Sequence, residues 1–183
     1  MKTVDARKIA GVLNVLVGIA LVCNVIAVYM VPTIVLVGGA QNLVGHLEQW
    51  GGLRGTLAAW GHGWIWFGSY EWVLTLFLVF AGVNTAVILR QARRVLGTVL
   101  RGEPFSMENA VSLSRAALSC FLIAGAALGR VIFSVWHYQS LRPLGTYNAL
   151  FVPMFAMGGL LCLVMSALFR QAAELKAEND LTI

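Results

Sequence analysis

A chain of 183 residues, of which 59% are hydrophobic and only 11% are charged, is too apolar for a water-soluble domain, because about a quarter of the residues in soluble domains carry charge. The mean hydropathy of +0.80 and the net charge of +5 indicate a basic helical membrane protein. The apolar runs are continuous, which excludes a β-barrel, whose strands alternate apolar and polar residues.

Four apolar runs are long enough to cross a membrane, since a helix needs about 20 residues to span the hydrocarbon core. We expect an all-α integral membrane four-helix bundle, a single domain over residues 1–183, with spans at about 9–37, 70–90, 110–137 and 149–170. An outer loop over 38–69 and an inner loop over 90–109 connect the first three spans. No small-x-small cleavage site follows the first run, so we expect it to stay as a signal anchor.

Basic residues predict the orientation, because Lys and Arg near the ends of spans stay in the cytoplasm. Ten of the 13 basic residues fall on one side of the predicted spans: Lys2, Arg7, Lys8, Arg90, Arg93, Arg94, Arg101, Arg115, Arg170 and Lys176. Both termini and the inner loop are therefore predicted to be cytoplasmic.

Aromatic side chains gather on the opposite, outer side. All six tryptophans and all three histidines fall there: Trp50, Trp60, Trp64, Trp66, Trp72, Trp136, His46, His62 and His137. Indole rings prefer the headgroup layer, so an aromatic belt is the simplest interpretation. The functional interpretation is an outer platform that contacts a lipid, an apolar ligand or a partner, with Trp64, Trp66 and His62 as candidate contacts.

The outer loop is rich in glycine but too apolar for a solvated linker. Leucine and tryptophan recur at helical spacing in two stretches, Leu43 to Trp50 and Leu53 to Trp60, separated by Gly51 and Gly52. The spacing predicts two short interfacial helices. A re-entrant lid over the bundle is the alternative.

The inner loop starts as a basic continuation of the second helix. Its candidate contact residues are Arg90, Arg93, Arg94 and Arg101. These charges would attract anionic lipid headgroups, at about 1 kcal/mol for each basic residue, or an acidic cytoplasmic protein. Gly102 and Pro104 end that helix and Ser106 is a natural N-cap, so the third helix is predicted to begin near Met107.

This inner stretch carries a resemblance to a known family. Arg101 to Asn109 reads Arg-Gly-Glu-Pro-Phe-Ser-Met-Glu-Asn and is followed by Leu113 and Arg115. It resembles the Gly-x-Pro-Phe-Ser-x-x-Asn stretch before the third span of the bacterial domain-of-unknown-function 2975 family, whose four-span layout also fits. The resemblance implies a bacterial inner-membrane protein of unassigned activity, often encoded beside a small helix-turn-helix transcription regulator. It supplies no catalytic residues, and the Trp-rich outer loop is not a family hallmark.

Polar side chains inside a span are costly without a partner and therefore mark candidate sites. Toward the outer side lie Asn24, Glu71 and, on the third span, Arg130, Ser134 and His137 at helical spacing. We predict that Arg130 pairs with Glu71, directly or through water. These groups either hold the helices together or form a ligand site. In such a site Arg130 would hold an anion, and His137 or His62 would tune its binding with pH.

Two pairs of small residues predict close helix contacts. Gly125 and Gly129 form a Gly-x-x-x-Gly pair on the third span, and Gly82 with Ala86 forms a similar face on the second. Such faces let helices approach closely. We expect these contacts inside the bundle, and a homodimer stays open.

Catalytic motifs do not appear in the sequence. It holds no Cys-x-x-Cys pair, no phosphate-binding Gly-rich loop and no Gly-x-Ser-x-Gly elbow. The side chains of His46, Glu48, His62, Glu71 and His137 share the outer side but match no metal-site spacing. We therefore predict a protein that is not an enzyme, with no cofactor, no metal and no direct nucleic-acid partner.

Two functions fit these patterns. The favoured one is a non-enzymatic inner-membrane regulator or sensor subunit, whose outer Trp-rich loop senses the envelope or a ligand while the basic inner loop contacts a cytoplasmic regulatory protein. The alternative is a small transporter or channel component that uses an outer polar site around Arg130. Membrane lipids are expected partners in both.

Overall fold

The computed structural model describes residues 6–38, 52–103, 105–145 and 147–180. Its helices, in chain order, are α1 (Ala6–Leu36), α3 (Leu53–Trp66), α4 (Ser69–Arg101), α5 (Met107–Tyr138), the short 3₁₀ helices η1 (Arg142–Gly145) and η2 (Tyr147–Leu150), and α6 (Phe151–Asp180). Four of them, α1, α4, α5 and α6, are long and apolar enough to cross a membrane. The predicted all-α architecture is confirmed, with four helices that have the length and apolar character of the predicted spans.

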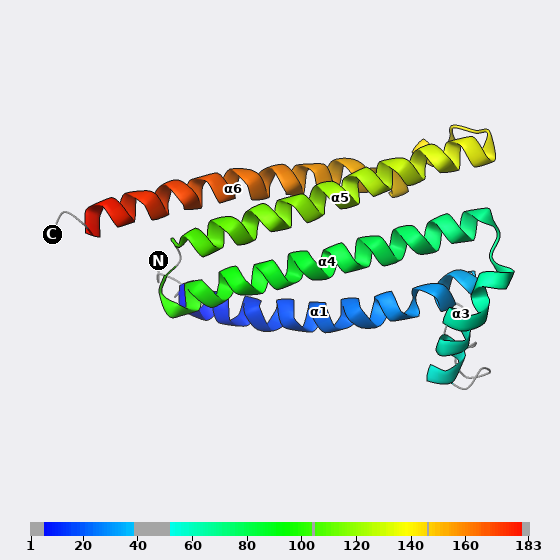
Figure 1. Ribbon diagram of the computed structural model, residues 1–183, viewed down its shortest axis with the longest axis horizontal. Coiled ribbons are helices and arrows are strands. Elements are labelled where there is room, and N and C mark those ends of the chain that lie inside the picture. The colour runs from blue at the N-terminus through cyan, green and yellow to red at the C-terminus, as the bar shows by residue number, and fades with distance from the viewer. Residues whose placement is uncertain (1–5, 39–51, 104, 146, 181–183) are drawn as a thin grey trace, which may run out of the picture.

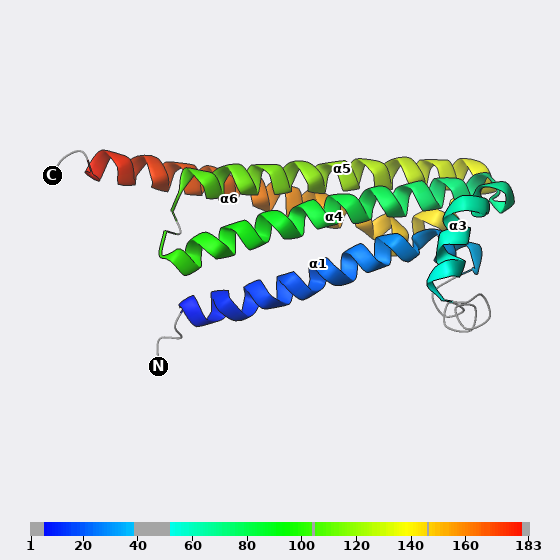
Figure 2. The same ribbon diagram turned by 60° about the horizontal axis from the view of Figure 1, so that its bottom comes forward.

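The spans pack in chain order, α1 against α4, α4 against α5 and α5 against α6 (Figure 1). No extended contact joins α1 to α6 within the described residues, so the two helices are the edges of an open row in Figure 1. Figure 2 shows α4 between α5 and α1. In the most apolar stretch of α5, 44% of the residues are buried, against 6% in both α1 and α6. The four helices of the expected bundle thus pack as a row, because lipid chains cover an apolar helix face as well as another helix does.

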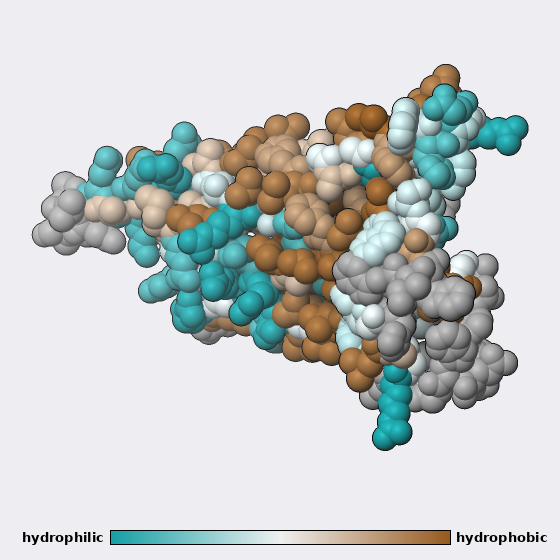
Figure 3. Space-filling view, turned by 45° about the vertical axis from the view of Figure 1, so that its right-hand side comes forward, coloured by the Kyte–Doolittle hydropathy of each residue, from teal (hydrophilic) through white to brown (hydrophobic). Residues whose placement is uncertain are grey.

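The two ends of the row differ in character. The start of α1, the end of α6 and the α4–α5 turn lie at one end, here called the terminal end, while α3, η1 and η2 lie at the other, here called the α3 end (Figure 1). Figure 3 shows an apolar belt between hydrophilic residues at the terminal end and the paler α3 end. This layering is that of a bilayer with two polar boundaries.

The α4–α5 turn is closed by caps on both helices. Gly102 ends α4 at φ 85° and ψ 13°, and the N–H groups of Gly102 and Glu103 donate to the carbonyls of Val99 and Thr98. This pattern is a Schellman motif, which requires a residue that tolerates positive φ. On α5, Ser106 accepts a hydrogen bond from the Asn109 N–H at 3.4 Å, so the predicted N-cap and the predicted start at Met107 are confirmed.

Asn109 ties the same turn together from inside. It is fully buried, and Thr98 is 2% exposed. The Thr98 hydroxyl lies 2.9 Å from Asn109 Oδ1, to which it donates a hydrogen bond. A buried polar pair of this kind is stable only while both members are satisfied, so the motif that carries the family resemblance has a structural role at this end.

Glycine sets the close helix contacts, but not at the predicted Gly-x-x-x-Gly pair. Gly82 on α4 lies against the side chain of Val28 on α1, where a Cβ at position 82 would clash. On α6, a Cβ at Gly159 would come within 3.0 Å of the Phe121 ring of α5. Gly125 and Gly129 are exposed with nothing within 4 Å of a Cβ. The expected contact inside the bundle through that pair is therefore wrong.

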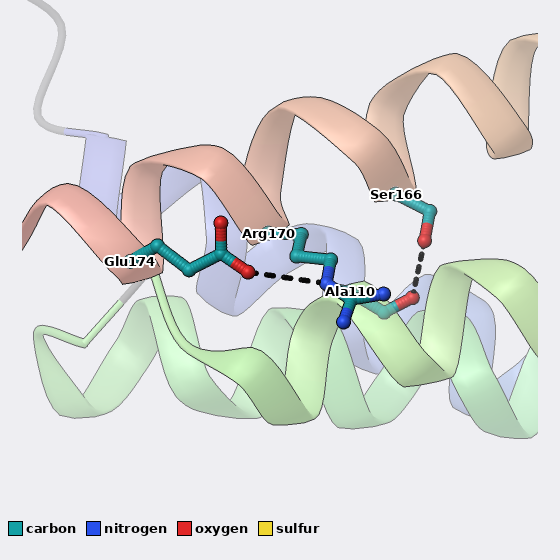
Figure 4. A network of polar contacts seen from close by, with 4 residues as sticks. All are labelled: Ala110, Ser166, Arg170 and Glu174. Carbon is teal, nitrogen blue, oxygen red and sulfur yellow. Dashed lines mark hydrogen bonds and ion pairs between the residues drawn. The ribbon is translucent and has the colours of Figure 1, made fainter.

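Side-chain hydrogen bonds add to these contacts in two places. The Ser166 hydroxyl of α6 donates to the Ala110 carbonyl of α5 at 2.7 Å (Figure 4). At the other end, the Trp60 indole of α3 donates to the Tyr29 carbonyl of α1 at 2.9 Å, and Thr56 donates to the Tyr29 hydroxyl at 3.0 Å. α3 is thereby fixed to α1 close to Pro32, whose ring interrupts the helical hydrogen bonds.

The second of the two helices predicted in the loop 38–69 is confirmed as α3. The first, over Leu43 to Trp50, lies outside the described residues.

Replacing Gly82 by Ala should lower the stability of the protein in detergent, because the new methyl group would meet Val28. Overpacking of this kind costs about 1–3 kcal/mol. Gly129→Ala is the matched control, since the same change on the open face of α5 gains up to about 1 kcal/mol of helix propensity. Thermal unfolding midpoints should fall for Gly82→Ala and hold or rise for Gly129→Ala. Equal midpoints would contradict the α1–α4 contact.

Replacing Asn109 by Ala should destabilise the α4–α5 hairpin by about 0.5–1.5 kcal/mol, the net contribution of one hydrogen bond. The Thr98 hydroxyl loses Asn109 Oδ1 as an acceptor but keeps the Val95 carbonyl at 2.7 Å. Ser114→Ala, at an exposed position of α5, should stay within about 0.5 kcal/mol of the wild type. A double-mutant cycle with Thr98→Val measures the pair directly. Fully additive losses would show that the two side chains do not interact.

Candidate functional site

A cavity of about 510 Å³ opens between α4 and α5 at the α3 end and is the candidate site. It is lined by Tyr70, Arg130, Val131, Ser134, Tyr138, Ser140, Arg142 and Pro143. Ligand sites for small molecules fall in this size range and combine apolar walls with a few polar groups. It is called the Arg130 cavity below.

Helical spacing and one chain reversal build the Arg130 cavity. Arg130, Ser134 and Tyr138 follow one another at intervals of four residues on α5, so they share a face. α5 ends at Gln139, whose φ of 47° and ψ of 37° are left-handed. The chain then turns back, and Ser140 Oγ accepts a hydrogen bond from the Arg142 N–H at 3.3 Å, which places Arg142 in the cavity wall.

Arg130 is the most unusual group of the cavity. It lies eight residues before the end of α5, about 12 Å by the helical rise, and is only 9% exposed. Its Cζ sits 4.8 Å from the centroid of the Phe77 ring of α4. A cation over an aromatic face is worth about 0.5–2 kcal/mol, which is small beside the cost of a charge within a span.

The predicted ion pair between Arg130 and Glu71 is not formed directly. Within the described residues the ion pair found is Arg170–Glu174, an exposed pair at 3.2 Å at the terminal end (Figure 4), of the kind that adds little stability. The Glu71 carboxylate instead turns back to Gly68, where a Cβ would meet its Oε2 at 2.6 Å. There it lies in the first turn of α4, a position that the helix dipole favours for a negative charge.

The remaining predicted site residues are spread more widely. The exposed His137 ring does not line the Arg130 cavity; it stacks with Phe133 and Tyr70 at centroid distances of 5.8 and 5.9 Å. Asn24 belongs to α1 and also lies outside the lining, with its Oδ1 buried and unpaired within the described part of the chain. His62, Trp64 and Trp66 fall in α3, but their side chains lie outside what the structure describes.

The basic residues predicted as contacts line a second cavity. Arg90, Arg93, Arg94 and Arg101 lie together between α1 and α4, toward the terminal end. The four residues line one cavity, and none of them lines the Arg130 cavity.

Sequence reasoning missed six of the eight lining residues, and four of these six carry polar groups: Tyr70, Tyr138, Ser140 and Arg142. Tyr138 continues the spacing of Arg130 and Ser134, so extending that pattern by one step would have found it. Arg142 enters only because the chain reverses at Gln139, a non-glycine residue with positive φ, and no local pattern foretells that reversal.

Metal binding finds no support in the described residues, which contain no group of three His, Cys, Asp or Glu side chains placed to hold an ion. His46 and Glu48, two members of the set considered from the sequence, lie outside the described residues.

Comparison with known proteins places these features in a family. Residues 66–183 match the family model described as Protein of unknown function (DUF2975). The chain belongs to this family. The match contains α4, α5 and α6 with the capped turn and the whole Arg130 cavity, whereas α1 and nearly all of α3 precede it. No curated protein and no solved structure matches the chain.

Glu71→Gln should cost less than about 1 kcal/mol, the contribution of a charge at a helix N-terminus, because Glu71 does not pair with Arg130. Breaking a buried ion pair would cost about 3–5 kcal/mol. The thermal unfolding midpoint in detergent at neutral pH distinguishes the small loss expected for a charge at a helix N-terminus from the larger loss expected for a buried ion pair. Phe77→Leu serves as the comparison, since it removes the aromatic face beneath Arg130 and should lower the midpoint more than Glu71→Gln does. A large fall in the unfolding midpoint of Glu71→Gln would show that Glu71 does pair with Arg130.

Proposed function

We propose that the protein is a non-enzymatic inner-membrane regulator or sensor subunit that takes an anion into the Arg130 cavity on the outer side and contacts a cytoplasmic protein at its terminal end. The observation that carries the proposal is the buried guanidinium of Arg130, which has an aromatic contact but no carboxylate partner among the described residues.

The cavity chemistry favours an anionic ligand. Arg130 and Arg142 both line it, and the hydroxyl-bearing residues Tyr70, Ser134, Tyr138 and Ser140 add donors. Guanidinium groups bind carboxylates and phosphates through two parallel hydrogen bonds. A bound anion would supply the counter-charge that a buried arginine needs. A phosphate, a carboxylate or an anionic headgroup fits this description.

The assignment of the cavity to the outer side rests on charge. The clustered arginines lie toward the opposite end of the row, which the positive-inside rule assigns to the cytoplasm. α3, with its tryptophans, is at the same end as the cavity (Figure 1). This arrangement supports a sensing role for the Trp-rich loop, next to a site that a periplasmic or lipid anion can enter.

The α4–α5 turn is the surface proposed for the cytoplasmic partner. Phe105 is 54% exposed and Met107 is 44% exposed, beside the charged Arg101, Glu103 and Glu108. Apolar side chains ringed by charges at the end of a membrane protein are typical of a protein contact.

Arg130→Gln should lower anion binding roughly 10- to 100-fold, because hydrogen bonds to a charged group contribute about 1.5–3 kcal/mol. The probes are inorganic phosphate, glycerol 3-phosphate and succinate, and the readout is thermal stabilisation of the purified full chain in mild detergent. Arg54→Gln is the control, since it removes an exposed charge from α3 without touching the cavity. Wild-type binding by Arg130→Gln would refute the anion site.

Two further measurements decide the regulatory role. A photo-crosslinking residue at Phe105 should capture the same cytoplasmic protein in repeated experiments, and Arg130→Gln should change the yield. In proteoliposomes the regulator should give no anion flux. Flux of a probe anion that depends on Arg130 would contradict the proposed regulatory function and support the alternative, a small transporter or channel component.

A further inference from the structure

A second cavity, of about 650 Å³, runs along the contact of α1 and α4 toward the terminal end. Its walls carry Asn14, Leu21 and Val25 from α1, Ala86, Arg90, Arg93, Arg94, Gly97 and Arg101 from α4, and Glu108 from α5. These residues define what is called the arginine groove. No residue of it lines the Arg130 cavity.

The register of α1 against α4 shows which groove residues lie at the same height. A Cβ at Gly11 would lie 3.9 Å from Leu100, a Cβ at Gly18 would lie 3.7 Å from the Arg93 guanidinium carbon, and Gly82 touches Val28. The helices are therefore antiparallel, and residues whose numbers sum to about 111 are level. Asn14 is then level with Gly97, Leu21 with Arg90, and Val25 with Ala86.

The arginine groove thus changes character along its length. Its charged part lies toward the terminal end, and its walls become purely apolar at Val25 and Ala86. Gly18 lies ten residues beyond Lys8, where the apolar stretch of α1 begins, or about 15 Å by the helical rise. The guanidinium of Arg93 therefore faces the apolar stretch of α1. On α4 itself the uncharged run from Trp72 ends at Leu89, so Arg90, Arg93 and Arg94 follow directly after the apolar part of that helix.

The charge of the groove is unbalanced. It has four arginines against one carboxylate, Glu108, and none of the four forms an ion pair with a described residue. All four are exposed, so their donors are accessible. Arg101 alone sits in the last turn of α4, where the helix dipole helps a positive charge. The others have no comparable compensation in the groove.

We propose that the arginine groove holds one anionic phospholipid, with its phosphodiester among Arg90, Arg93 and Arg94 and an acyl chain along Leu21 and Val25. The shared chemistry is a phosphate monoanion, which arginine binds well. The apolar end of the groove favours a lipid over a soluble phosphate, because a soluble anion gains nothing from burying Val25 and Ala86. Basic pockets between membrane helices bind lipid headgroups by the same physics. This inference does not depend on the Arg130 cavity.

The proposed phosphate position in the groove is separate from the apolar surface proposed for a protein partner, although Arg101 and Glu108 border both. Arg93 reaches the level of Gly18 within the span, whereas Phe105 lies in the turn beyond the end of α4. A cytoplasmic protein can reach the turn without entering the lipid layer.

The test uses the full chain purified in mild detergent and depleted of lipid, with native mass spectrometry to count lipids retained after activation. Phosphatidylglycerol should be retained at a ratio of one per chain, and phosphatidylcholine should not. The double variant Arg93→Gln/Arg94→Gln should reduce phosphatidylglycerol retention at least roughly tenfold. Arg115→Gln is the matched control. The hydrogen bond between Thr98 and Asn109 sets the register of α4 against α5 and places Arg115 of α5 level with Ala92 of α4. Arg115 therefore lies at the same height as the groove arginines but does not line the groove.

A second variant tests the groove without removing charge. Nothing lies within 4 Å of a Cβ at Gly97, so Gly97→Leu should fold, gain helix propensity and fill the groove. Retention of phosphatidylglycerol should then fall although all four arginines remain. Unchanged retention in Gly97→Leu would show that the arginines act only as surface charge and would overturn the proposal.

A soluble competitor separates the two sources of phosphate. Glycerol 3-phosphate added in large excess should leave the phosphatidylglycerol adduct in place, because it lacks the acyl chain. Displacement by glycerol 3-phosphate, or equal retention of phosphatidylcholine, would overturn the lipid assignment. A photo-crosslinking residue at Leu21 should label lipid in cells, and labelling of a protein in its place would likewise count against it.

Discussion

Polar groups within a membrane span must find partners inside the protein, because hydrocarbon offers none. Some of those described here do so: Asn84 and Thr85 donate to carbonyls one turn earlier on α4, and Ser166 bridges α6 to α5. Buried oxygen atoms of Asn24, Thr33, Thr75 and Gln91 have no hydrogen-bond partner in the described part of the chain. The guanidiniums are different. Arg130 has only the Phe77 ring, and the arginines between α1 and α4 have no ion pair in the described residues. Both sets depend on something the chain does not supply, which is why both are binding sites in our proposals.

The number of spans and the packing of the spans follow from different physics. Hydrophobic length predicts the four crossings and the turn at Gly102 to Ser106, since a helix must be long enough to cross and must be capped where it ends. Helix partners are not set by hydrophobicity, because a lipid chain covers an apolar face equally well. The pair Gly125 and Gly129 therefore stays on the surface, while Gly82 and Gly159 make the close contacts. The small face at Gly82 is predicted from its spacing with Ala86, but the residue that fills it, Val28, is not, because shape complementarity has no signature in a single sequence.

The residues of the Arg130 cavity likewise divide into those that the sequence pattern predicts and those that it does not. Arg130 and Ser134 follow from helical spacing, whereas Arg142 comes from a turn at Gln139 that no local pattern indicates. The direct pairing of Arg130 with Glu71 is not formed, and a carboxylate in the first turn of a helix is already stabilised by the helix dipole. Helical spacing therefore identifies the buried cation, but it does not show which group contacts it directly.

α4 belongs to both cationic sites. Phe77 supports Arg130 near its start, and Arg93 lines the arginine groove sixteen residues later, about 24 Å along the helix. Two ligands so far apart do not touch, so either could affect the other only through a movement of α4 against α1 or α5. Gly82, which lies against Val28 of α1, is between the two sites, so any movement of α4 against α1 has to be accommodated at this contact. Linkage is reciprocal: an anion that changes lipid affinity by some factor must have its own affinity changed by the lipid to the same degree. A sensor requires such coupling between its two ends, and a passive anion site does not.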